Sequence, residues 1–192
     1  MRLALFLCLL ASPAGGDYLP LESGTRWTYE VGTESTLAPG APEAARELIS
    51  EVKGAAALPD GDWTEVSNFL GYETCWARTT DAAVEIRTEA VENAPVLPLL
   101  RLPARAGDAW TGSLGREEVS FVVAGEQTLD DGRRAVRVDF TVASTEKHAA
   151  PAATRGVLWF ERGAGLVRAS ITKDLDCHSA STTVYRLKRE PR

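Results

Sequence analysis

The chain has 192 residues, of which 44% are hydrophobic and 25% are charged. This length suits one medium domain or two small ones, and this hydrophobic content is enough for a buried core, so a largely disordered chain is not expected. The formal net charge is −6, from 21 Lys and Arg against 27 Asp and Glu. An acidic chain without a basic block lacks the electrostatic footprint of a nucleic-acid binder, and an anionic membrane surface would repel it.

Residues 1–16 are typical of a secretory signal peptide. Arg2 precedes an apolar run over residues 3–10, and small residues with a Pro-Gly break follow at 11–16. A buried first strand is the alternative, but such a strand fits the break less naturally. We therefore expect an exported protein, periplasmic or extracellular, whose mature part is a single domain over residues 17–192.

No membrane anchor is expected from the sequence. Cys8 follows Leu7, whereas a bacterial lipoprotein signal has a small residue at that position, so lipidation of Cys8 is not supported. No later stretch approaches the apolar length of a membrane span. The mature chain is therefore expected to lack a transmembrane segment.

A ten-residue pattern occurs twice, over residues 19–28 and 102–111, with Leu, Pro, Gly, Trp and Thr at the same positions. Proline favours an extended lead-in, the glycine (Gly24 or Gly107) permits a tight turn, and the tryptophan then enters a core as a strand begins. Two weaker echoes follow: residues 46–50 resemble 116–120, and residues 60–61 resemble 131–132. The sequence thus predicts an old duplication, with related halves at about 17–100 and 101–192.

Period-two alternation predicts strands along the whole mature chain and no amphipathic helix. The expected strands lie at residues 26–32 and 46–53, in a long extended stretch that bends at Gly71, and at residues 84–86, 136–142, 156–162, 166–173 and 182–189. After Trp110 the order of elements is expected to repeat, with residues 116–120 in the place of 46–50. In the bent stretch, Val66, Leu70, Tyr72 and Trp76 share one parity. Gly163 and Gly165 mark a turn, and residues 89–100, with two prolines, are expected to be an irregular connection.

This pattern predicts an all-β, mainly antiparallel fold of about eleven strands. A single antiparallel sheet of that size is long enough to curl into an open, partly closed barrel. The fold is expected to be built from the two related halves.

Cys75 and Cys177 are the two cysteines of the mature chain. In an oxidising compartment an even pair favours a disulfide, which would close a loop of about a hundred residues and contribute roughly 4 kcal/mol in the chain-entropy model. Two unrelated buried thiols are the alternative.

Two segments resemble a family of bacterial exported proteins and lipoproteins. The members open with Tyr-Phe-Pro-Leu, two residues, Gly, two residues and Trp, and later carry Trp-Phe-Ala-Pro-Gly-Val-Gly-Leu-Val-Lys. The matching segments here are residues 18–27 and 159–168, in which Glu161 and Arg162 replace Ala-Pro and Ala164 replaces Val. The resemblance spans essentially the whole mature chain and implies a β-rich envelope domain of unassigned function, with no catalytic residue to carry over.

Metal and phosphate sites are not expected. His148 lies in a polar loop, and His178 stands beside Asp174, Asp176 and Cys177. Neighbours on a strand point to opposite faces, and a disulfide thiol cannot bind a metal, so this cluster is a poor metal site. The segment 163–165 has half of a dinucleotide motif, but no helix follows to hold phosphate. We expect no metal and no cofactor.

Catalytic motifs are also lacking. No Gly-x-Ser-x-Gly elbow occurs. Acidic residues that a glycosidase might pair are present at Glu117-Glu118, Asp130-Asp131, Asp174 and Asp176, but a chain with 27 acids forms such pairs by chance. We expect a non-enzymatic protein with no catalytic residue.

Five tryptophans are the most suggestive feature: Trp27, Trp63, Trp76, Trp110 and Trp159. They either line a concave site for an apolar ligand or fill the core of the sheet, and core filling is the favoured interpretation. The leading hypothesis is a non-catalytic exported domain of the cell envelope that binds an apolar ligand or an envelope partner. The alternatives are a purely structural or interaction protein that uses strand edges, and a hydrolase with an Asp/Glu pair.

Overall fold

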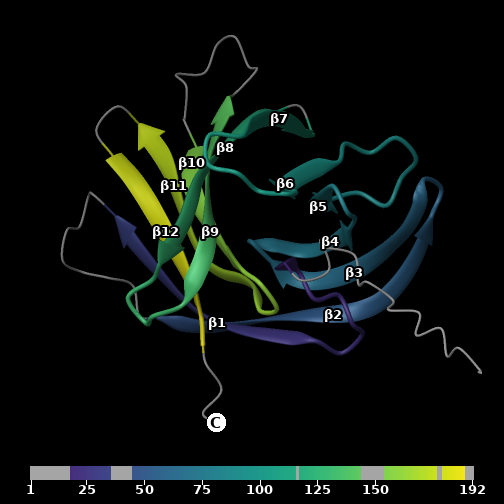
Figure 1. Ribbon diagram of the computed structural model, residues 1–192, viewed down its shortest axis with the longest axis horizontal. Helices are drawn as coiled ribbons and strands as arrows, with labels where there is room; N and C mark the ends of the chain where they lie inside the picture. Colours follow the sequence, from purple (N-terminus) through teal and green to yellow (C-terminus); the bar gives the residue numbers. More distant parts are fainter. Residues whose placement is uncertain (1–17, 36–44, 116, 144–153, 177–178, 189–192) are drawn as a thin grey trace, which may run out of the picture.

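The computed structural model describes residues 18–35, 45–115, 117–143, 154–176 and 179–188. These residues form twelve strands and no helix (Figure 1). The strands are β1 (Arg26–Ser35), β2 (Arg46–Leu58), β3 (Gly61–Phe69), β4 (Tyr72–Thr79), β5 (Ala83–Arg87), β6 (Leu97–Arg101), β7 (Ala109–Leu114), β8 (Glu117–Thr128), β9 (Arg134–Ala143), β10 (Thr154–Glu161), β11 (Gly165–Asp176) and β12 (Ser179–Leu187).

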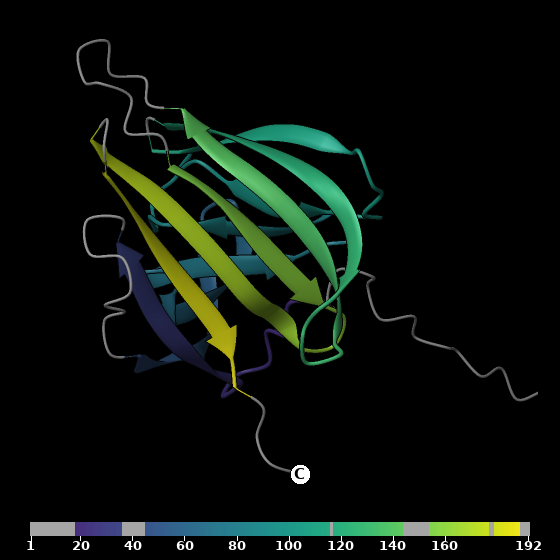
Figure 2. The same ribbon diagram turned by 90° about the vertical axis from the view of Figure 1, so that its left-hand side faces the viewer.

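All twelve strands belong to one antiparallel sheet in the order β6-β5-β4-β3-β2-β1-β12-β11-β10-β9-β8-β7. The first strand therefore pairs with the last, and β6 and β7 are the two ends of the sheet. The sheet curls until these ends approach each other at the top of Figure 1, so that the wall of β8 to β12 faces the strands of the first half (Figure 2). The predicted all-β, antiparallel, incompletely closed barrel is confirmed, with one seam between β6 and β7.

Strand β6 lies where the sequence predicted an irregular connection. Residues 97–101 pair with β5, with Pro98 opposite Glu85. A proline is tolerated here because β6 is an edge strand, where one side of the backbone needs no ladder partner. The count is therefore twelve strands, six before residue 102 and six after it.

The two copies of the repeated pattern make the same backbone contacts. The N–H of Gly24 donates to the carbonyl of Val52 at 2.9 Å, and the N–H of Gly107 donates to the carbonyl of Val123 at 2.8 Å. A β-bulge follows each acceptor. Gly24 and Gly107 have φ of 85° and 89°, a region that favours glycine, so each turn depends on its glycine.

This correspondence shifts one of the predicted echoes by a residue. With Val52 matched to Val123, residues 46–50 correspond to 117–121 and not to 116–120. In this register the half-buried Leu48 of the first half corresponds to the buried Val119 of the second half. Both residues then lie on the inward face of the sheet. The duplication itself stays a prediction.

The interior of the barrel holds one continuous hydrophobic core. On β8 the residues Val119, Phe121 and Val123 point inward and are buried, and the residues between them are exposed. This alternation is the period-two signal of a sheet with one face on the core. Trp110 stacks on Phe121 with ring centroids 5.3 Å apart, which closes the core beside the seam.

A second buried group lies on the outer face of the first half. Trp63 is 1% exposed, and two guanidinium groups contact its ring. The guanidinium carbon of Arg78 lies 4.3 Å from the ring centroid and that of Arg87 lies 5.1 Å from it. Arg87 is fully buried; it bonds to Asp60 and donates to the backbone carbonyls of Glu89 and Val91. Arg87 therefore ties Trp63, the β2–β3 turn and the segment after β5 into one unit.

The predicted signal peptide, residues 1–16, lies outside the described part of the chain. Among the described residues, no helix has the length and apolar character needed to cross a membrane.

Cys75 is a free, fully buried thiol on β4. Its predicted partner, Cys177, lies outside the described residues, so the structure does not support the proposed disulfide. Burial raises the pKa of the Cys75 thiol to about 12. The residue therefore has the character of an inert core thiol.

We expect Cys75 to resist iodoacetamide in the folded protein at pH 8, because the reactive thiolate is suppressed and the sulfur is buried. Peptide mass spectrometry after native and denatured labelling measures this. Modification only after denaturation, with no reductant, is the expected result. Modification that requires reductant would instead establish a disulfide.

Candidate functional site

A cavity of about 370 Å³ opens inside one end of the barrel. Its floor is apolar and buried, and it is formed by Ile86, Leu97, Leu99, Val119, Phe121 and Leu158. The volume lies at the lower end of the range for small-molecule sites. The strands of both halves contribute, so the cavity exists only because the sheet curls back on itself.

The sheet register explains why the space stays open. Cross-strand partners form a row of side chains along one wall: Thr183, Ile171, Gly156, Phe140, Phe121 and Trp110. At the centre of this row Gly156 has no side chain, and the ring of Phe140 lies against its backbone. A larger residue at this position would push Phe140 toward the cavity that it lines.

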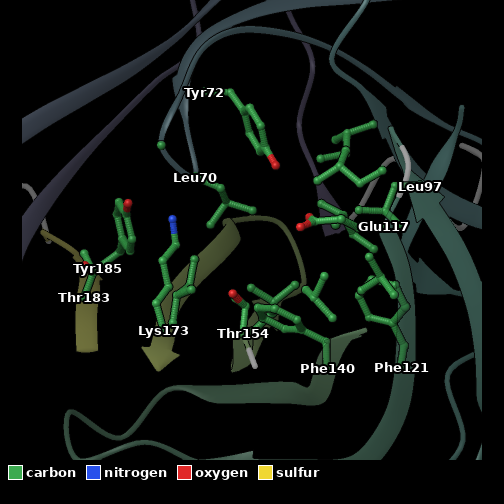
Figure 3. A pocket seen from close by; sticks show the side chains of 18 residues that line it. Leu70, Tyr72, Leu97, Glu117, Phe121, Phe140, Thr154, Lys173, Thr183 and Tyr185 are labelled. Atoms are coloured by element: carbon green, nitrogen blue, oxygen red, sulfur yellow. The ribbon is translucent and has the colours of Figure 1, made fainter. Parts of the chain in front are cut away.

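The mouth of the cavity is polar. Lys173 on β11 has Thr154 as its direct cross-strand partner on β10, and both line the cavity. Figure 3 shows the ammonium group of Lys173 and the carboxylate of Glu117 directed into the cavity from opposite sides, with the hydroxyl groups of Tyr72 and Thr154 also facing it. The cavity thus combines an apolar floor with one positive and one negative charge at its rim.

Neither charge at the rim is neutralised by a described residue. Lys173 and Glu117 form no ion pair or hydrogen bond with any part of the chain that the structure describes, although Arg155 and Asp174 pair on the same two strands, β10 and β11. Burial raises the pKa of the Tyr72 phenol, and the charge of Glu117 raises it further. Tyr72 therefore remains a hydrogen-bond donor at neutral pH.

None of the five tryptophans is among the residues that line this cavity. Trp27 and Trp110 belong to the interior core, where their indole N–H groups donate to the carbonyls of Ala164 and Pro98. Trp63 and Trp159 are buried outside that core, each beside two arginines. Trp76 is half-buried.

Trp76 does not face the same way as Val66, Leu70 and Tyr72, the residues with which it was expected to share a face. Its neighbours Cys75 and Ala77 belong to the interior core, so alternation places Trp76 on the outer face. Tyr72 lines the cavity and packs against the core, so the inward face changes parity within β4, between Tyr72 and Cys75. Leu70 also packs against the core.

The acidic residues that were considered for catalysis are scattered. Asp130 pairs with Arg168, Asp131 with Arg133 and Asp174 with Arg155. Glu117 lines both the cavity and a hollow at the seam, and Glu118 lines that hollow alone. The side chain of Asp176 lies outside the described set. Among the carboxylates that the structure describes, these contacts therefore indicate separate roles and not a catalytic pair.

His148, Cys177 and His178 also lie outside the described residues. Within the part of the chain that is described, no three His, Cys, Asp or Glu side chains are close enough to hold a metal ion. Gly163 and Gly165 have φ of 81° and 91° at the turn between β10 and β11.

The seam between β6 and β7 carries the second hollow, which is wider and more polar. The seam is bridged by a hydrogen bond, since the indole N–H of Trp110 donates to the carbonyl of Pro98 at 2.8 Å. A Cβ on Gly112 would lie only 2.9 Å from Leu97 and 3.1 Å from Pro98, so these strands are in close contact. A partner strand would have to displace this packing to enter the seam.

The sequence carries a signal for the site that does not belong to any short motif. Lys173 falls on the same parity as the inward-facing Ala169 and Ile171, and Glu117 on the same parity as Val119 and Phe121. A charged residue at an inward position of a strand is unusual, because burial of an unpaired charge is costly. Here Lys173 and Glu117 are exposed and line the mouth of the cavity, where their charges stay in contact with water.

No protein-family model matches the sequence, and a search of curated proteins found no significant match. Two solved structures are similar. One, from Bacteroides fragilis, is described as a candidate exported protein with a YmcC-like fold; it has a TM-score of 0.48 at 15% identity, over 90% of this chain and 99% of that one. The other, from Parabacteroides distasonis, is described as a candidate lipoprotein; it has a TM-score of 0.45 at 16% identity, over 88% of this chain and 97% of that one. Neither description names a ligand or a reaction, so the function of this chain has to be inferred from its own side chains.

Proposed function

We propose that this protein is an exported, non-catalytic binding protein that holds the apolar part of a small amphiphilic molecule inside the barrel. The observation that supports this function is the cavity of about 370 Å³ with a buried aliphatic floor and a polar mouth. The floor offers the hydrophobic contact that drives binding, and the mouth keeps a polar group in contact with water.

The size of the cavity favours a single short chain. Its volume corresponds to about a dozen water molecules, and a methylene group occupies a similar space. An alkyl chain of roughly ten carbons therefore suits it. Each methylene that enters the cavity should tighten binding about fourfold, from the free energy of burying one methylene.

Filling the cavity tests this function. Val142 lines the cavity, whereas the adjacent Thr141 is exposed on the same strand, β9. We expect Val142→Trp to abolish the fluorescence enhancement of the neutral probe N-phenyl-1-naphthylamine, and Thr141→Trp to preserve it. Loss of binding in both variants, or in neither, would contradict the assignment of the ligand to this cavity.

The purified protein offers an independent test. Mass spectrometry of an organic extract of protein from its producing cells should reveal a short-chain amphiphile in the wild type and little of it in the Val142→Trp variant. Equal amounts of such molecules in the two samples would overturn the proposal.

A further inference from the structure

We infer that the site selects amphiphiles whose headgroup carries both a positive and a negative charge. This inference rests on the proposed function and names the class of ligand. Lys173 and Glu117 line the mouth on opposite sides, and neither is paired with a described residue. A zwitterionic headgroup satisfies both charges at once, and an anionic or cationic headgroup leaves one of them facing a like charge.

The two sides of the mouth differ in their hydrogen-bonding groups. Beside Lys173 are the hydroxyl groups of Thr154, its cross-strand partner, and of Thr183, both among the lining residues. An ammonium group with neighbouring hydroxyl donors suits the anionic part of a headgroup.

The opposite side suits the cationic part. Among the described residues that line this cavity, Glu117 carries the only carboxylate, and its charge raises the pKa of the nearby Tyr72 phenol. The carboxylate of Glu117 offers the opposite charge to a cationic group, and the Tyr72 hydroxyl beside it faces the same space.

The remainder of the chain argues against a simple anion site. The protein carries a net charge of −6, and Lys173 is the only basic residue among the described residues that line the cavity. An anionic ligand would gain one ion pair at Lys173 while approaching the carboxylate of Glu117. A zwitterion avoids that repulsion and gains a second favourable contact.

Three probes with ten-carbon chains separate these cases: decylphosphocholine, decanoate (whose ten carbons include the carboxylate carbon) and decyltrimethylammonium. Isothermal titration of the wild type below micelle formation should show decylphosphocholine binding about tenfold tighter than either singly charged probe. Lys173→Gln and Glu117→Gln should each remove this preference and leave the chain-length dependence intact.

The charge-reversed double variant, Glu117→Lys with Lys173→Glu, is the decisive control. It keeps both charges across the mouth, so the preference for decylphosphocholine should return, while either single reversal should abolish it. Both side chains are exposed, so the variants should fold normally.

The outcomes distinguish this inference from the function on which it rests. Equal binding of all three probes that is abolished by Val142→Trp would overturn the headgroup inference and leave the proposed function standing. Tightest binding of decanoate would show an anion site and overturn the inference in the same way. Failure of every probe to bind would count against the proposed function itself.

Discussion

Replacement of Arg87 by methionine is expected to lower the free energy of unfolding by about 3 kcal/mol, because three acceptors lose their hydrogen bonds to a fully buried guanidinium group. The guanidinium group is 0% exposed and bonds to Asp60 and to the carbonyls of Glu89 and Val91. Methionine fills similar space but leaves these acceptors without their donor. Denaturation in guanidinium chloride, followed by tryptophan fluorescence, measures the loss.

Arg78 supplies the matched control. It contacts the same indole ring of Trp63, but its side chain is 30% exposed and its partner, Glu85, lies on the adjacent strand. We expect Arg78→Met to cost about 1 kcal/mol or less, as is usual for an exposed pair. Equal losses in the two variants would show that stacking on Trp63, and not the buried hydrogen bonds of Arg87, stabilises this unit.

The ion pair between Asp60 and Arg87 predicts that the stability of the fold depends on pH in the acid range. Burial tends to raise the pKa of Asp60, but the hydrogen bond and the positive charge of Arg87 outweigh it and hold that pKa below its ordinary value of 3.8. The pair therefore stabilises the fold above that value, and the contribution is lost as the pH falls through the lowered pKa. The free energies of unfolding of the wild type and of the Asp60→Asn variant should therefore become equal as the pH is lowered below about 4.

Gly156→Ala is expected to destabilise the protein by about 3 kcal/mol, the upper end of the range for an overpacked core. A Cβ at this position would lie 2.4 Å from the carbonyl oxygen of Ser170 and 2.6 Å from the ring of Phe140. The ring can move, but the oxygen belongs to the backbone of β11. Adding Phe140→Leu should therefore recover only part of the loss.

Gly32→Ala on β1 is the control for this change. No atom lies within 4 Å of a Cβ built on Gly32, and the residue needs no left-handed backbone. We expect this variant to be neutral or more stable by up to about 1 kcal/mol, because alanine restricts the unfolded chain. Similar losses at both glycines would indicate a general cost of alanine in these strands and not a clash at Gly156.

The fold could be predicted from the sequence because its signals are local. Alternation along β8 and β9, the turn at residues 59–60 and the turn glycines each depend on a few neighbouring residues. The strand β6 was missed because its proline argues against a strand, and only the position at the edge of the sheet makes it acceptable. Whether β6 lies at the edge of the sheet depends on how all twelve strands are ordered, which a local stretch of sequence does not contain.

The site was harder to predict because it depends on how distant strands face one another. Trp63 looks like a core residue, yet it lies on the outer face, where Arg87 and the segment after β5 bury it. Glu117 was weighed as half of a carboxylate pair, whereas its significance comes from Lys173, which lies across the cavity on β11. No short motif contains that relationship.

The proposed function requires that the barrel hold an alkyl chain on its aliphatic floor. Intermolecular nuclear Overhauser effects between the decyl chain of bound decylphosphocholine and protein methyl groups test it directly. The account predicts contacts to Leu97, Leu99 and Leu158, which line the cavity, and none to Ile49 or Val122, which are exposed elsewhere. Contacts confined to the exposed methyl groups, or spread evenly over both sets, would contradict it.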